Sequence, residues 1–145
     1  MDRLERLLAM TRQHETQIAD AISSDFGHRS RHETVMAEIF TVIAAIGHAR
    51  RHLRRWMKPG RVPTPLYLLP GYSRVLSQPL GVIGIISPWN YPFQLAVAPA
   101  VGAIAAGNRV MLKPSEFTPR LSTLLEAIVA LHFAPDELAV VRGDA

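Results

Sequence analysis

The sequence predicts an α/β fold in which N-terminal helices and a β-hairpin precede a β-α-β-α-β unit with a parallel sheet. Three observations support this class. Apolar residues recur at helical spacing over roughly the first 57 positions. Four prolines then interrupt the chain between residues 61 and 79. From residue 81 onward, short β-branched runs alternate with helix-length segments, as in parallel sheets with right-handed crossovers.

The first 60 residues favour two helices. Residues 3–23 carry one apolar stripe: Leu4, Leu7, Leu8, Ile18, Ala21 and Ile22. A loop around Gly27 follows, and Ser30 with Glu33 has the spacing of a capping box. We expect a second helix from about residue 31 to 57, ended by Pro59 and Gly60. Its predicted buried stripe consists of Val42, Ile43, Ile46, Ala49, Leu53 and Trp56.

Residues 61–79 predict a hairpin at a sheet edge. Two short apolar runs, 66–69 and 72–76, flank Pro70 and Gly71, which suit a turn. Such short strands are not stable alone, so we expect the hairpin to lie across something larger.

The β-α-β-α-β unit begins with GVIGIIS at 81–87, a continuous apolar run expected for a strand buried on both faces. Pro92 suits the first turn of a helix that Asn90 could cap, and Gly107 with Asn108 suits its end. The interior Pro99 should bend this helix. RVMLK at 109–113 predicts the second strand, 120–132 a helix, and 138–141 the third strand.

Two polar motifs follow the first two strands, PWN at 88–90 and KPSE at 113–116. Ligands of such sheets bind outside the carboxyl ends of the strands, so both motifs are candidates for one site. The Asn90 amide could donate to an oxygen that gains negative charge, or it could only cap a helix. Lys113 and Glu116 could bind a nucleotide's ribose or phosphate, or form a surface ion pair of little energetic value. The chain has no G-x-G-x-x-G motif after Ser87.

Composition narrows the function classes. The chain has 145 residues, a net charge of +4 and no cysteine, which excludes disulfides, thiolate metal sites and a cysteine nucleophile within it. No apolar run reaches the roughly 18–20 residues of a membrane span, and no export signal is apparent, so a cytoplasmic location is expected. The basic stretch 48–61 is interpreted as a solvated helix face rather than a nucleic-acid site. Neither the His28/His32 nor the His48/His52 pair is expected to bind metal.

The run from Pro79 to Pro119 resembles the N-terminal signature of the NAD(P)-dependent aldehyde dehydrogenase family, since it combines WNYPF, AAGN and KPSE at matching spacings. WNYPF resembles the fatty and aromatic aldehyde branch. SSDFGHRSRHET with HLRRWMKP is most similar to bacterial coniferyl aldehyde dehydrogenases. The resemblance implies a helical segment at 1–60, a hairpin at 61–79 as an oligomerisation element, and the first part of an NAD(P)-binding domain at 80–145. It also implies a homodimer or larger oligomer.

The same resemblance implies a role for each motif. Asn90 would donate to the aldehyde oxygen as that oxygen becomes an oxyanion, and Lys113 would bind the adenosine ribose. The other implied cofactor-binding residues are Ile86, Ser87, Pro88, Trp89, Pro114, Ser115 and Glu116. The missing G-x-G-x-x-G fits, because this family binds its cofactor in a variant Rossmann fold. A carboxylate at Glu116 favours NAD weakly over NADP.

The chain also departs from the family pattern. It lacks the family's nucleophilic cysteine, the E-L-G-G-K glutamate and the catalytic domain, so residues 1–145 alone are expected to be inactive. We expect the chain to be the N-terminal part of a longer enzyme. The alternative is a non-catalytic nucleotide-binding or interaction fragment. A third possibility, an acyl-CoA-linked reductase on the same scaffold, is disfavoured by the PWN and KPSE pair.

Overall fold

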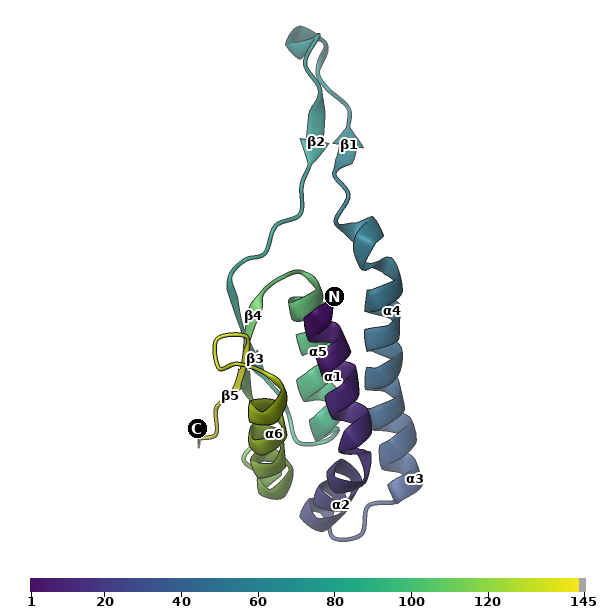
Figure 1. Ribbon diagram of the computed structural model, residues 1–145, viewed down its shortest axis with the longest axis vertical. Helices are drawn as coiled ribbons and strands as arrows, with labels where there is room; N and C mark the ends of the chain where they lie inside the picture. The colour runs from purple at the N-terminus through teal and green to yellow at the C-terminus, as the bar shows by residue number, and fades with distance from the viewer. Residues whose placement is uncertain (144–145) are drawn as a thin grey trace.

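The computed structural model describes residues 1–143 and has three layers (Figure 1). A parallel sheet forms the first layer, two helices that follow its strands cover one face, and the N-terminal helices pack outside them. The N-terminal layer consists of α1 (Asp2–Gln13), α2 (Glu15–Phe26), α3 (Arg31–Thr34), a π-helical segment η1 (Val35–Ile39) and α4 (Phe40–Trp56).

The expected single helix over 3–23 is two helices. The chain breaks at His14, whose backbone (φ −107°, ψ 12°) is not helical. The break lets α1 pack against α4 and α6 (Pro119–His132) while α2 packs mainly against α6. The second expected helix is confirmed from 31 onward, and the Ser30 side chain accepts a hydrogen bond from the Glu33 amide. Its π-helical turn, Val35–Ile39, was not predicted.

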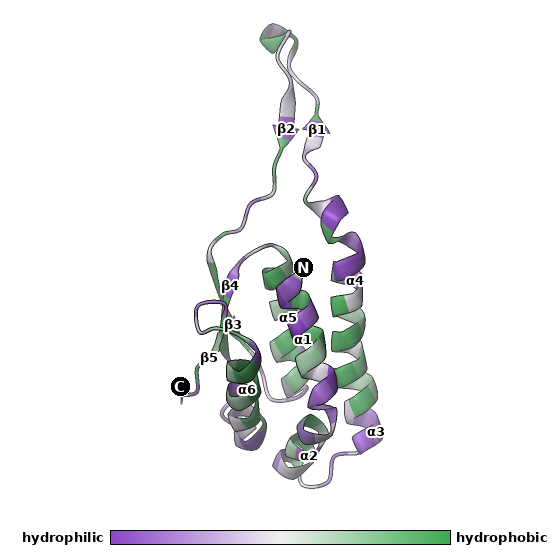
Figure 2. Cartoon of the chain, viewed as in Figure 1, coloured by the Kyte–Doolittle hydropathy of each residue, from purple (hydrophilic) through white to green (hydrophobic). Residues whose placement is uncertain are grey.

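The C-terminal end of α4 is more exposed than its apolar spacing predicts. Val42, Ile46, Ala49 and Leu53 are buried as expected, but Trp56 is 47% exposed because the helix here runs beyond the body of the molecule. Hydrophilic residues dominate this end (Figure 2). His48, His52 and Trp56 stack in succession along it, with 4.2 Å between the two histidine ring centroids.

The hairpin projects away from the body (Figure 1), but its strands differ from the expected ones. Strand β1 (Gly60–Val62) pairs antiparallel with β2 (Ser73–Val75), whereas the apolar run at 66–69 forms a 3₁₀ turn, η2 (Leu66–Leu68), at the tip. Gly71 is required there, because a Cβ would lie 2.7 Å from the Leu68 carbonyl oxygen. The tip side chains lack a packing partner within residues 1–143 that would favour strand pairing, and Leu66 and Tyr67 are over 80% exposed.

The predicted parallel sheet is confirmed and consists of β3 (Val82–Ile86), β4 (Arg109–Lys113) and β5 (Leu138–Val140). Its strand order is β3-β4-β5. The crossover helices α5 (Pro92–Ala105) and α6 cover the same face, because each right-handed crossover steps in the same direction. The first strand is therefore not buried on both faces: Ile85 is 8% exposed on the helix side and Ile86 is 82% exposed on the other.

Asn108 ties the end of α5 to the start of the sheet, close to its predicted role. Gly107 has a positive φ of 89°, and the Asn108 amide donates back to the Ala103 carbonyl. The Asn108 side chain also donates to Ala103 and accepts from the Gly81 amide at 3.0 Å. Helix α5 continues through Pro99.

Candidate functional site

The two polar motifs meet at one edge of the sheet, as expected. Ile86 and Lys113 are register partners at the ends of β3 and β4, and the Ser87 amide donates to the Lys113 carbonyl at 3.0 Å. The peptide that leads into PWN is thus hydrogen-bonded to the first residue of KPSE. Parallel strands with carboxyl ends at one edge produce this arrangement.

Asn90 does not cap α5. The helix begins at Pro92 with Tyr91 in the N-cap position, and no side chain of these flanking residues caps it. The capping interpretation of Asn90 is therefore wrong. No hydrogen bond joins the Asn90 side chain to any residue of 1–143. The backbone carbonyl of Asn90 accepts one, from the Arg29 Nη1 at 2.9 Å. The side-chain amide is left available for another acceptor.

Glu38 caps α5 from a distant part of the sequence. Its Oε2 accepts hydrogen bonds from the amides of Phe93 (2.7 Å) and Gln94 (3.2 Å). Glu38 lies in the π-helical segment η1 and is fully buried. A carboxylate at a helix N-terminus satisfies free amides and interacts favourably with the helix dipole, contributing up to about 2 kcal/mol when partly buried.

Burial and neighbouring groups shift the pKa of Glu38 in opposite directions. Burial raises its pKa, while hydrogen bonds from the Gln94 and Phe93 amides and the charge of Arg29 act in the opposite direction. Arg29 Nη1 lies 3.3 Å from Glu38 Oε1. The guanidinium thus compensates a carboxylate that the solvent cannot reach.

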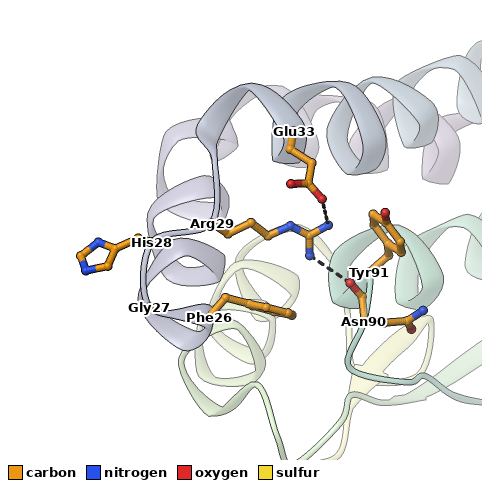
Figure 3. Close-up of a pocket in the computed structure, with 7 residues that line it drawn as sticks. All are labelled: Phe26, Gly27, His28, Arg29, Glu33, Asn90 and Tyr91. Carbon is orange, nitrogen blue, oxygen red and sulfur yellow. Dashed lines mark hydrogen bonds and ion pairs between the residues drawn. The ribbon is translucent and has the colours of Figure 1, made fainter.

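Arg29 forms one side of an open cleft of about 440 Å³ next to Asn90 (Figure 3). Its guanidinium lies 5.0 Å from the ring centre of Phe26 and 4.6 Å from that of Tyr91. In Figure 3 the guanidinium reaches the Asn90 carbonyl, while the Asn90 side chain points away from Arg29. The cleft is lined by Phe26, Gly27, His28, Arg29, Glu33, Asn90 and Tyr91.

The KPSE motif forms an ion pair and a second recess. Lys113 Nζ lies 3.0 Å from Glu116 Oε2, and both side chains are partly exposed. Hydrogen bonds from its own backbone amide and from Lys113 lower the pKa of Glu116. The recess, of about 170 Å³, is lined by Pro114, Ser115, Glu116, Pro119, Ser122, Arg142 and Gly143. A cation and a carboxylate beside a recess suit the hydroxyl groups of a ribose.

The remaining predicted residues lie around the same sheet edge. Ile86, Pro88 and Trp89 are exposed, whereas Ser87 is 4% exposed. The Ser87 hydroxyl is buried without a hydrogen-bond partner among the described residues. The unpaired Ser87 hydroxyl could bond a polar group of a dinucleotide, and the exposed Ile86 and Trp89 side chains could contact one of its planar rings.

Sequence reasoning missed Glu38, Arg29, Asp25 and Arg142. A signal existed for Glu38, because it falls on the same helical stripe as Val42 and Ile46, where a charged residue is unusual. Asp25 accepts from the Arg120 and Leu121 amides and so caps α6, but nothing near it in sequence indicates this. Arg142 pairs with Glu126 beside the second recess.

Metal sites and membrane spans are the two remaining kinds of site about which the sequence makes a prediction. Within 1–143, no group of three or more potential ligand side chains is placed to hold a metal ion. No helix of the same range is long and apolar enough to cross a membrane.

Comparison with known proteins identifies the relatives of this chain. The aldehyde dehydrogenase family model matches residues 1–145. Coniferyl aldehyde dehydrogenase of a Pseudomonas species is 47% identical over 146 residues, covering 100% of this chain and 30% of the relative. A probable coniferyl aldehyde dehydrogenase of Caulobacter vibrioides is 45% identical over 143 residues, covering 97% and 30%.

A solved structure agrees with the fold. The substrate-bound state of AldH from Staphylococcus aureus superposes with a TM-score of 0.93 at 36% identity, covering 98% of this chain and 31% of that one. The sheet and helices described above therefore match the N-terminal part of the Rossmann-type fold of such enzymes. This chain spans about 30% of the length of the curated relatives it matches.

Proposed function

The chain belongs to the aldehyde dehydrogenase family, and on this premise we propose that it supplies the oxyanion donor and half of the cofactor site of an enzyme that oxidises aldehydes with NAD(P). The observation that carries the proposal is the Asn90 amide. It stands at a strand end with no hydrogen bond to residues 1–143, next to a helix that another residue caps. A side-chain amide donor at this place can stabilise a developing oxyanion once it is positioned against it.

The chain's own residues divide the task. Asn90 donates to the aldehyde oxygen as negative charge forms on it. Lys113 and Glu116 bind ribose hydroxyls, and Ile86, Ser87, Pro88, Trp89, Pro114 and Ser115 line the cofactor cleft. When bound, the nicotinamide cofactor supplies the hydride acceptor. The nucleophilic cysteine comes from outside these 145 residues, which contain none.

The proposed substrate is an aromatic aldehyde of the coniferyl type, because two of the relatives are named for coniferyl aldehyde. Phe26, Tyr91 and Trp89 provide exposed or half-exposed rings near Asn90, and Phe26 and Trp89 have ring centres 6.2 Å apart. A long-chain aliphatic aldehyde is the competing substrate, since the WNYPF form also resembles enzymes for fatty aldehydes.

We further propose that the hairpin contacts another subunit. Its tip exposes large apolar side chains, which is unusual on a surface that stays in water. They are Leu66, Tyr67, Leu68, Leu69 and Tyr72. Homo-oligomers commonly bury patches of this kind.

A grafted enzyme tests the function. Residues 1–145 replace the matching segment of the Pseudomonas coniferyl aldehyde dehydrogenase, and all later residues come from that relative. We expect NADH formation from coniferyl aldehyde, with a higher kcat/KM than for a long-chain aliphatic aldehyde. Residues 1–145 alone should form no NADH. A folded grafted enzyme without activity on any aldehyde would refute the proposal.

A further inference from the structure

Two residues from the N-terminal part of the chain bind the segment that contains Asn90 and the start of α5. The Arg29 guanidinium donates to the Asn90 carbonyl at 2.9 Å. Glu38 accepts from the Phe93 and Gln94 amides, three and four positions further along. The Arg29 and Glu38 side chains are themselves paired at 3.3 Å. We refer to this pair as the Arg29–Glu38 clamp.

Nothing local replaces the clamp. Tyr91 occupies the N-cap position without a capping side chain, and the preceding Pro88 and Trp89 are exposed. The Asn90 side chain has no bond to residues 1–143 that would fix its rotamer. The backbone of the turn therefore depends on contacts from outside its own segment.

Burial makes the clamp rigid. The Arg29 side chain is 7% exposed and Glu38 is 0% exposed, and the guanidinium contacts the rings of Phe26 and Tyr91. The π-helical turn places Glu38 on the buried side of η1, facing α5. Turns of this kind are frequent at functional sites. A planar, multiply bonded guanidinium also loses little freedom on binding.

We propose that Arg29 and Glu38 are positioning residues that aim the Asn90 amide at the aldehyde oxygen. The inference rests on the proposed function, because it concerns the same donor. An oxyanion donor acts only when it lies about 2.7–3.1 Å from the position of the developing charge. A displacement of about 1 Å can lower turnover about 100-fold. The clamp controls that displacement without touching the substrate.

The chain offers a matched control in Asp25. This carboxylate caps α6 by accepting from the Arg120 and Leu121 amides at 3.1 and 3.0 Å, much as Glu38 caps α5. It makes no hydrogen bond to the turn at residues 88–91. Asp25→Asn therefore replaces one acceptor oxygen and the charge of a comparable helix cap, as Glu38→Gln does, without touching the clamp.

The first test measures kinetics in the grafted enzyme. Glu38→Gln keeps an oxygen that can accept from the Phe93 amide. The carboxylate oxygen that faces Arg29 is replaced by an uncharged amide nitrogen, so the ion pair is lost. Arg29→Lys removes the planar guanidinium, whose Nη1 meets both Glu38 and the Asn90 backbone carbonyl while its Nη2 pairs with Glu33. We expect each variant to lower kcat on coniferyl aldehyde roughly 10-fold, by partial misplacement of the donor, with the KM for NAD nearly unchanged. Asp25→Asn should lower the Tm similarly but change kcat less than about twofold.

A double-mutant cycle separates positioning from general stability. In an Asn90→Ala background, Glu38→Gln should cause no further fall in kcat, because its effect acts through Asn90. An undiminished fall in that background, or a fall no larger than that of Asp25→Asn, overturns the proposal.

A second readout does not depend on activity. Hydrogen exchange over residues 88–94 of the grafted enzyme should be faster in Glu38→Gln and in Arg29→Lys than in the graft without these substitutions, and it should be unchanged in Asp25→Asn. Equal exchange rates in the two variants and in the unsubstituted graft would overturn the clamp, even if the graft were inactive. Faster exchange in the two variants of an inactive graft would support the clamp and refute only the proposed function.

Discussion

Helix α5 is capped by Glu38, which is distant in sequence, and not by Asn90, which lies just before the helix in the chain. Glu38 lies 55 positions before Phe93, from whose amide it accepts a hydrogen bond. The prediction of a cap from neighbouring residues failed here. A sequence motif can identify only capping residues next to the helix, whereas Glu38 reaches α5 through tertiary packing. The same holds for Asp25 and the start of α6.

Glu116 gives a prediction about cofactor preference. Its own backbone amide and Lys113 lower its pKa, so the carboxylate is ionised at neutral pH and should repel a 2′-phosphate. In the grafted enzyme, Glu116→Gln should raise kcat/KM for NADP roughly 10-fold, because an ionised carboxylate no longer faces the 2′-phosphate. The value for NAD should stay equal or fall. Glu5→Gln makes the same charge change at an exposed pair with Arg50, away from the recess, and should leave the NAD to NADP ratio unchanged.

At the scale of the elements, the Arg6 side chain connects α1 to the end of α6 and the start of β5. Arg6 of α1 binds Glu137, just before β5, through two hydrogen bonds of 2.7 Å, and it also donates to the carbonyl of His132 at the end of α6. The Arg6 guanidinium lies 4.9 Å from the ring centre of Phe133. One side chain thus joins the N-terminal helical layer to the sheet domain.

This contact predicts a pH dependence of stability. Hydrogen bonds from Arg6 lower the pKa of Glu137 from 4.5 to about 2. A depressed pKa in the folded state contributes stability above pH 4.5 that is lost as the pH falls toward 2. We expect Glu137→Gln to have a lower Tm than wild type at pH 7, with the difference shrinking below about pH 4.5. Equal differences at pH 7 and pH 3 would contradict this. Glu126→Gln, which breaks an exposed pair with Arg142, should cost only about 0–1 kcal/mol.

Most elements of the fold could be predicted because their signals are local. Helical spacing, the 81–87 run and the Gly107–Asn108 cap lie within single segments, and the parallel sheet follows from their alternation. The π-helical turn, the position of the hairpin strands and the exposed face of β3 could not be predicted, because each depends on which other segment packs there. For the site, the motifs located Asn90 and Lys113, but the Arg29–Glu38 clamp depends on tertiary contacts.

At the scale of the whole molecule, one face of the parallel sheet, the bare face, is left without a covering helix among residues 1–143. The helices α5 and α6 lie on the other side, and Val82, Ile86 and Met111 are 61%, 82% and 50% exposed. Apolar surface of this kind promotes association. This chain covers only 31% of the solved structure from Staphylococcus aureus.

We therefore expect residues 1–145 alone to self-associate at micromolar concentration. Analytical ultracentrifugation should show species larger than the 16.1 kDa monomer, and Ile86→Thr with Met111→Gln should shift the distribution toward the monomer. A monodisperse wild-type monomer over the same range would show that the bare face is not adhesive. The grafted enzyme carrying both substitutions serves as a control for folding.

The turnover of Asn90→Asp in the grafted enzyme tests the central claim most directly. Asn90 caps nothing, so the substitution should leave the Tm and the NAD affinity nearly unchanged. An ionised aspartate cannot donate, and it places negative charge beside the developing oxyanion. Loss of such a donor lowers kcat about 10²- to 10³-fold, and we predict a fall of this size with saturating coniferyl aldehyde. Near-normal turnover in a well-folded Asn90→Asp enzyme would contradict the assignment of Asn90 as the oxyanion donor.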